Sequence, residues 1–222
     1  MTIYFLSGLG ADKRAFKKLK LPDEWDIKYI EWLDNLEKES LSDYCRRLAK
    51  QIDTSKPFCL VGLSFGGIVA VELSRILRTE KTIIISSVSN RHELPITFCV
   101  LRLLPVHKLI PSFFYKRVDF LTYWFLGTKT PEERRLLREI VTDTNVHFAK
   151  WAVGQIISWK NAVRPDNLVH IMGTADKIFN VNRTQADIRI TGGEHFMIFT
   201  MADTISEILR ERLDSNEPNS KA

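Results

Sequence analysis

Short runs rich in β-branched and aromatic residues recur along the chain and predict strands. They occupy residues 2–6, 26–31, 57–62, 81–87, 168–172 and 187–190. The centre of the fourth run consists of three consecutive isoleucines. Continuous apolar strands are typical of parallel sheets that are covered on both faces. The pattern therefore predicts a mostly parallel sheet of about six strands.

Stretches with the spacing of helices separate these runs. Residues 12–20, 68–77 and 198–213 have this spacing. Ser40 is expected to cap a further helix, because Asp43 follows three positions later and Tyr44 begins an apolar series at helical spacing. Alternating strands and helices predict an α/β fold with a doubly wound sheet.

The alternation stops between residues 90 and 165. This segment contains helical patterns without a strand between them, and Thr130 followed by Pro131 marks one helix start. We expect a helical cap inserted after the fourth strand. The predicted division is a core domain of residues 1–89 and 166–214, a cap of residues 90–165 and a flexible tail of residues 215–222.

The composition is that of an ordinary globular protein. Hydrophobic residues make up 45% of the 222 residues, which is enough for a substantial core without disulfides or metals. The cysteines Cys45, Cys59 and Cys99 are widely spaced, so neither a zinc site nor a disulfide framework is expected. A reducing, cytoplasmic compartment fits this cysteine content. The first apolar run meets Gly8 too early to be a signal peptide.

The net charge of +5 is mild, and no nucleic-acid-binding motif accompanies it, so no nucleic-acid partner is expected. The predicted cap holds twelve Lys and Arg against six Asp and Glu. A solvated basic face explains this excess, with an acidic substrate or an anionic membrane surface as alternatives. No membrane span is expected, because the most apolar stretch, residues 96–125, is broken by Arg102, Pro105, Pro111 and Lys116.

A Gly-Leu-Ser-Phe-Gly motif at residues 62–66 lies between the third predicted strand and the helix that follows it. It matches the Gly-x-Ser-x-Gly pattern, in which a serine occupies a strained strand-to-helix turn and small residues on either side give the backbone room. The N-terminus of the helix directs free N–H groups toward the reaction centre. Ser64 is therefore the candidate nucleophile. The alternative is a serine that only caps the helix.

A serine nucleophile needs a general base, and the base needs an acid that orients it. His195 lies on a glycine-flanked loop at the carboxyl end of the sixth predicted strand. His170 falls inside a strand, and the three remaining histidines fall in the predicted cap. His195 is therefore the candidate base, with a solvated loop histidine as the alternative.

Asp176 directly follows the fifth predicted strand and lies between Ser64 and His195 in the chain. The order serine, aspartate, histidine is one of the known orders of such triads. Asp176 is the candidate acid, unless its side chain only closes a local turn. The other candidate acids are Asp187, Glu194 and Asp203.

The oxyanion that develops during acyl transfer needs preorganised N–H donors. Phe65, the residue after the serine, is expected to supply one of them. The loop after the first strand, residues 7–10, is expected to supply the other through Leu9, because glycines on both sides let its N–H face the pocket. We call this segment the glycine loop. The alternative is a turn that only joins a strand to a helix.

Four segments, residues 7–12, 62–67, 173–177 and 192–196, together resemble the α/β-hydrolase superfamily. They follow one another in the family's order and span nearly everything outside the predicted cap. Family members usually carry a His-Gly pair where Ser7 and Gly8 stand here, and usually begin with two additional strands. A serine in place of an aspartate nucleophile argues against dehalogenase or epoxide-hydrolase chemistry.

The resemblance implies acyl transfer to water from a carboxylic ester or a related small-molecule acyl substrate, with no metal or cofactor. The alternatives are a thioesterase, an acyltransferase or a carbon–carbon bond hydrolase on the same triad, and a ligand-binding protein without turnover. Candidates for the substrate pocket, which packing of the cap against the core explains as well, are Leu63, Phe113, Tyr123, Trp124, Trp151 and Phe196. The sequence carries no signal for the oligomeric state.

Overall fold

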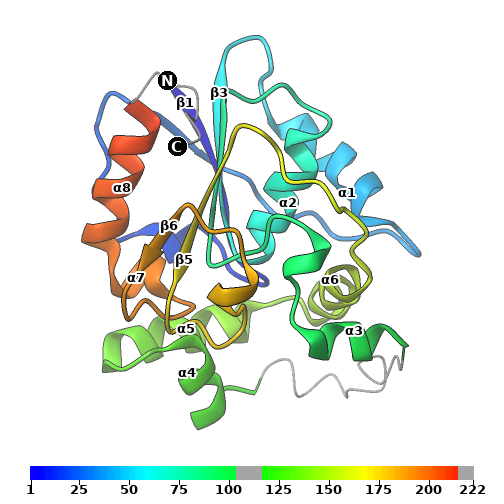
Figure 1. Cartoon of the computed structure of the whole chain (residues 1–222), viewed down its shortest axis with the longest axis vertical. Coiled ribbons are helices and arrows are strands. Elements are labelled where there is room, and N and C mark those ends of the chain that lie inside the picture. The colour runs from blue at the N-terminus through cyan, green and yellow to red at the C-terminus, as the bar shows by residue number, and fades with distance from the viewer. Residues whose placement is uncertain (104–116, 215–222) are drawn as a thin grey trace.

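A computed structural model describes residues 1–103 and 117–214, and its centre is a six-stranded sheet (Figure 1). All paired strands are parallel, in the order β2-β1-β3-β4-β5-β6. The strands are β1 (Thr2–Leu6), β2 (Asp26–Tyr29), β3 (Phe58–Leu63), β4 (Lys81–Ile85), β5 (Leu168–Gly173) and β6 (Ile188–Ile190). The predicted parallel sheet is thus confirmed.

Helices cover both faces of this sheet. The α-helices of the described residues are α1 (Leu41–Leu48), α2 (Phe65–Ser74), α3 (Ile96–Leu103), α4 (Phe120–Leu126), α5 (Pro131–Asp143), α6 (Val146–Ser158), α7 (Met197–Thr200) and α8 (Ala202–Asp214). Tyr4 and Leu6 of β1 join an apolar cluster with α1, α2 and α6. Ile3 and Phe5 join a second cluster with α5, α7 and α8. Because alternate residues of a strand point to opposite faces, the two clusters lie on opposite sides, and the sheet is doubly wound.

The position of each strand explains its composition. Every residue of β3, in the middle of the sheet, is buried, as its continuous apolar sequence predicts. β2 lies at one edge and is largely exposed. It ends at Tyr29, whereas the sequence predicts a strand over residues 26–31, because its pairing with β1 stops at Phe5.

The segment between β4 and β5 contains α3, α4, α5 and α6, and no described residue in it forms a strand. In Figure 1 these helices gather at the end of the sheet where the strands finish. The helix start with Pro131 in the first turn of α5 is as predicted, and Thr130 and Glu133 form a capping box there. The division of the chain into a core domain and a cap stays a prediction.

Three helices differ from the sequence prediction. The stretch 12–20 forms only one short 3-10 helix, Lys13–Phe16, and then turns, because Leu19 N–H donates to the Phe16 carbonyl. The predicted last helix is two helices, because Met201 leaves the helical region at φ −127° and ψ 39°. α2 begins at Phe65, directly after the candidate nucleophile, instead of three residues later.

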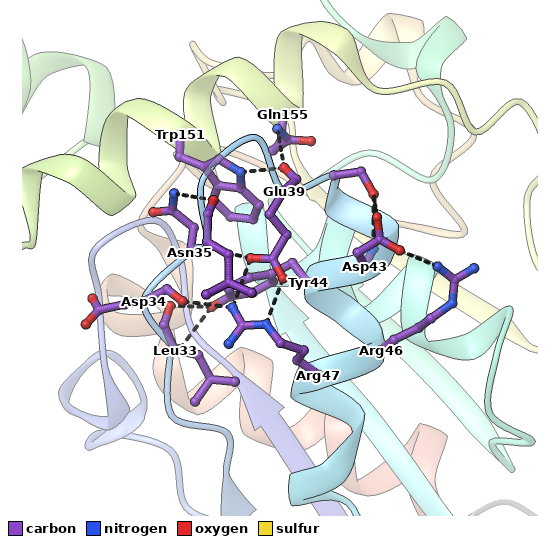
Figure 2. A network of polar contacts seen from close by, with 12 residues as sticks. Leu33, Asp34, Asn35, Glu39, Asp43, Tyr44, Arg46, Arg47, Trp151 and Gln155 are labelled. Atoms are coloured by element: carbon purple, nitrogen blue, oxygen red, sulfur yellow. Dashed lines mark hydrogen bonds and ion pairs between the residues drawn. The ribbon is translucent and has the colours of Figure 1, made fainter.

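A polar network joins the loop after β2 to α1 and α6 (Figure 2). The Glu39 side chain is 4% exposed and forms a bidentate ion pair with Arg47, at 2.7 and 2.9 Å. The Glu39 carbonyl oxygen accepts hydrogen bonds from Trp151 Nε1 at 2.9 Å and from Gln155. The network therefore fixes α6, far away in the sequence, against this loop.

Candidate active site

Ser64 lies at the turn between β3 and α2 in a backbone conformation that few residues other than glycine adopt. Its φ is 52° and its ψ is −117°, and its N–H donates to the Ile85 carbonyl at 2.9 Å. A Cβ on Gly62 would lie 2.4 Å from the Gly66 carbonyl oxygen, and one on Gly66 would lie 2.3 Å from two backbone oxygens. The turn therefore requires glycine at both positions. Such strain persists only where the surrounding structure holds it.

Three side chains from separate loops form a continuous line of hydrogen bonds. Ser64 Oγ lies 2.9 Å from His195 Nε2, and His195 Nδ1 lies 2.8 Å from Asp176 Oδ2. The ring of Phe179 packs against that of His195, with ring centres 5.7 Å apart, and His195 is buried. The structure thus brings together the three residues that the sequence singled out, from the ends of β3, β5 and β6.

The Asp176 carboxylate is fully buried, and both of its oxygens accept hydrogen bonds. Its Oδ1 accepts hydrogen bonds from the N–H groups of Ile178 at 2.8 Å and Phe179 at 2.9 Å. Burial alone would raise the pKa of Asp176, but attraction to His195 and these hydrogen bonds outweigh it and hold the pKa below its ordinary value. An ionised Asp176 accepts from Nδ1–H of His195 and leaves Nε2 available to accept the serine proton.

The glycine loop lies against Ser64. A Cβ on Gly8 would lie 3.6 Å from Ser64 Cβ. Gly8 also accepts a hydrogen bond from Ala11 N–H at 3.0 Å, which closes a turn with Gly10 at a φ of 66°. In the described part of the chain, neither the Leu9 N–H nor the Phe65 N–H donates to a protein group. Both donors are therefore available to a ligand oxygen.

Solved structures of low sequence identity share this architecture. An esterase from Thermogutta terrifontis matches with a TM-score of 0.69 and 15% identity, over 96% of this chain and 89% of that chain. MenH from S. aureus matches with a TM-score of 0.69 and 14% identity, over 96% and 95%. A bromoperoxidase from Bacillus anthracis matches with a TM-score of 0.66 and 14% identity, over 96% and 92%. The chain has the α/β-hydrolase fold. No protein-family model and no curated protein matches the sequence.

The remaining candidate acids lie elsewhere in the α/β-hydrolase fold. Asp187 accepts a hydrogen bond from the backbone N–H of His170 at 2.7 Å. Glu194 forms ion pairs with two lysines, and Asp203 forms an exposed ion pair with another. Among the described contacts, none of the three carboxylates meets the His195 ring. Asp176 is thus the acid that the geometry favours.

A second polar chain lies behind the serine, and the sequence analysis did not predict it. Ser87 Oγ donates to the Ser64 carbonyl at 2.7 Å, and the Ser87 carbonyl lies 3.0 Å from His170 Nε2. His170, which the sequence places inside a strand, is fully buried, and its Nδ1 lies 3.9 Å from a Glu93 carboxylate oxygen. Burial lowers the pKa of His170, although Glu93 opposes the shift. The signal in the sequence is the serines that directly follow the isoleucine run of β4.

Three of the predicted pocket residues pack into the two cores of the α/β-hydrolase fold. Leu63 and Phe196 belong to the apolar cluster on one face of the sheet. Trp151 packs against the cluster on the other face, with its ring 4.6 Å from that of Tyr44. These three residues contribute to the packing of the core, and their place in a substrate pocket stays a prediction.

Two other predicted pocket residues lie on α4. Trp124 is 49% exposed, and Lys177 Nζ lies 5.1 Å from the centre of its ring. Lys177 directly follows Asp176 in the sequence, so this contact connects Trp124 to the loop that carries Asp176. Tyr123 accepts a hydrogen bond from an arginine of α5. Phe113, the sixth predicted pocket residue, lies outside the described residues.

Within residues 1–103 and 117–214, no three His, Cys, Asp or Glu side chains lie close enough together to hold a metal ion. No helix in the same ranges is long and apolar enough to cross a bilayer. Cys45 and Cys59 are buried free thiols, and burial raises the pKa of both. Neither cysteine has the features of a reactive thiolate.

Proposed function

We propose that the protein is a serine hydrolase that cleaves a carboxylic ester, or a related small acyl substrate, through an acyl-enzyme. The observation that carries the proposal is the line from Ser64 Oγ through His195 to Asp176, at 2.9 and 2.8 Å, in an α/β-hydrolase fold. An esterase and a hydrolase among the structural neighbours support hydrolytic chemistry.

In the first half-reaction, Ser64 Oγ attacks the acyl carbon while its proton passes to His195 Nε2. Asp176 stabilises the resulting imidazolium and holds the ring in place. The N–H groups of Leu9 and Phe65 stabilise the tetrahedral oxyanion. His195 then returns the proton to the leaving alcohol oxygen, and the acyl group stays on Ser64.

In the second half-reaction, a water molecule attacks the acyl carbon while His195 Nε2 takes one of its protons. The new oxyanion occupies the same pair of N–H groups. As the bond to Ser64 Oγ breaks, His195 gives the proton back to the serine. The products are a carboxylic acid and an enzyme ready for the next turnover.

We further propose that residues 90–165 form a cap that contributes to substrate selection. Its described helices lie at the end of the sheet where Ser64, Asp176 and His195 are found (Figure 1). Trp124 and Tyr123 are the described residues that we assign to the pocket, because both lie on α4 and Lys177, which contacts the Trp124 ring, directly follows Asp176. Both side chains could contact an apolar acyl or alcohol group.

Labelling with a fluorophosphonate probe, together with hydrolysis of p-nitrophenyl esters of varied chain length, tests the proposal. The wild type should be labelled and should hydrolyse at least the short esters, whereas Ser64→Ala should do neither. Ser74→Ala, a change on the same helix away from the turn, is the matched control. A wild type that resists the probe while control hydrolases react would refute the proposal. Full activity in Ser64→Ala would instead refute the assignment of the nucleophile.

A further inference from the structure

The junction between α5 and α6, residues 143–145, reaches across to the glycine loop. Thr144 is buried, and its Oγ1 lies 3.1 Å from the Gly10 carbonyl oxygen and 2.8 Å from the Ile140 carbonyl oxygen. The two carbonyl oxygens share the single hydroxyl hydrogen: the contact with Ile140 is local, whereas the contact with Gly10 joins segments that are far apart in the sequence. A residue of the predicted cap therefore touches the loop that carries the proposed oxyanion donor.

The contact at Gly10 leaves no free space. A Cβ on Gly10 would lie 2.3 Å from Thr144 Oγ1 and 2.5 Å from its Cγ2, and the φ of Gly10 is 66°. The positive φ and the close approach both call for glycine. Thr144 thus packs directly on the backbone of the turn, and a shift of this side chain would move the turn.

The residues on either side of Thr144 bind neighbouring loops. Asp143 accepts a hydrogen bond from Arg14 Nη2 at 2.7 Å, just beyond the glycine loop. Asn145 caps α6 and donates to Asp34 Oδ1 at 2.9 Å. Three consecutive residues therefore hold the junction in place from different sides.

The other end of the turn is held from the core. The Ala11 carbonyl accepts hydrogen bonds from Ser7 Oγ at 2.6 Å and from Trp32 Nε1 at 3.1 Å. The carbonyl groups of residues 10 and 11 are thus both engaged, one by the junction and one by the core. Because the Gly8 carbonyl and Ala11 N–H close the turn, these contacts set the direction of the Leu9 N–H between them.

We propose that Thr144 is a positioning residue for the oxyanion hole, so that the junction couples the helical segment to catalysis. This inference rests on the proposed hydrolase function, because it assigns a role to Leu9 in stabilising the transition state. Thr144 does not touch the reacting atoms. It acts through the Gly10 carbonyl, and its effect should appear in the chemical step and not in substrate binding.

Thr144→Val, which keeps the shape and removes the hydroxyl, tests the role. We expect kcat for p-nitrophenyl esters to fall about tenfold with KM nearly unchanged. A trifluoromethyl ketone adds to the serine and forms an oxyanion, so its inhibition constant should rise by the same factor. Thr144→Ser should restore both values. Thr142→Val, at an exposed threonine of α5 two residues before Thr144, is the control and should match the wild type.

Each result separates the two proposals. A wild type that neither hydrolyses the esters nor binds the ketone refutes the hydrolase function, and the role of Thr144 with it. An active wild type with an unchanged Thr144→Val refutes only the positioning role. An equal loss in Thr144→Val and Thr144→Ser also refutes it. If Thr144→Val does not fold, Asp143→Asn weakens the ion pair that holds the junction to Arg14 and should also lower kcat and ketone affinity, whereas an unchanged Asp143→Asn would refute the positioning role.

Discussion

Asp176 shows how the surroundings of one residue determine its chemistry. A fully buried carboxyl group would ordinarily take up a proton, since low dielectric disfavours the charge. Here one oxygen accepts two backbone N–H groups and the other meets His195, so the pKa falls instead. The sequence places Asp176 after a strand, but the two backbone donors come from the turn that follows it and appear only in the structure.

Replacing Asp176 by asparagine should reduce kcat by roughly 10³–10⁴-fold, because an amide neither stabilises the imidazolium nor enforces the same ring tautomer. Ester hydrolysis by purified protein, with circular dichroism to verify folding, measures the effect. Asp203→Asn, at an exposed ion pair, is the control and should retain full activity. A folded Asp176→Asn with near-normal kcat would exclude Asp176 as the orienting acid.

The loop after β2 stabilises the position of α6 through hydrogen bonds, in addition to the packing of α6 on the core. It carries Glu39, which combines a buried ion pair with Arg47 and a carbonyl bonded to Trp151 (Figure 2). The hydrogen bonds from Arg47 lower the pKa of Glu39, although its burial opposes the shift. Since α6 packs Phe148 against Phe65, this attachment also supports the residue next to Ser64.

Arg47→Met should lower the free energy of unfolding by roughly 3 kcal/mol, because it leaves the buried Glu39 carboxylate without its partner. Urea denaturation near neutral pH measures this change. The adjacent Arg46 provides a matched control, since its ion pair with Asp43 is exposed on both sides. Arg46→Met should change the stability by less than about 1 kcal/mol. Equal changes in the free energy of unfolding for the two substitutions would show that the burial of Glu39 does not increase the contribution of its ion pair to stability.

At the scale of the whole molecule, folding buries His170, and burial makes its protonation less favourable. His170 lies within β5, and burial holds its pKa below the ordinary value of 6.5. An unfolded chain therefore binds a proton at pH values where the folded protein does not. Because the unfolded state binds more protons, the stability falls as the pH drops below about 6.5, by up to roughly 1.4 kcal/mol per pH unit.

His170→Gln should remove this part of the pH dependence while an amide N–H still reaches the Ser87 carbonyl. Urea titrations of both proteins between pH 7 and 5 give the free energy of unfolding at each pH. The slope of this free energy against pH is then compared between the two proteins. The wild-type slope should be the steeper one. Parallel slopes would mean that His170 takes up its proton equally in the folded and unfolded states.

The sequence predicts the sheet well because most of its strands are buried and continuous, and because glycine motifs mark the ends of four of them. It also predicts Ser64, His195 and Asp176, since each follows a strand whose carboxyl end must lie at one edge of the sheet. The other residues around the candidate site depend on tertiary contacts that the sequence pattern does not indicate. Ser87 and Thr144 are ordinary polar residues in the sequence, and only the packing of distant segments places them against Ser64 and Gly10.

The order of the strands also has a consequence for partial chains. Ser64 lies in the first third of the sequence, whereas Asp176 and His195 follow the long helical segment. A ribosome that has completed β4 has made the proposed nucleophile but neither of its proposed partners, so on this mechanism a nascent or prematurely terminated product is inert. A cut within the helical segment divides the site in the same way. Two separately expressed pieces would therefore hydrolyse an ester only after they reassemble, which makes turnover a direct measure of their association.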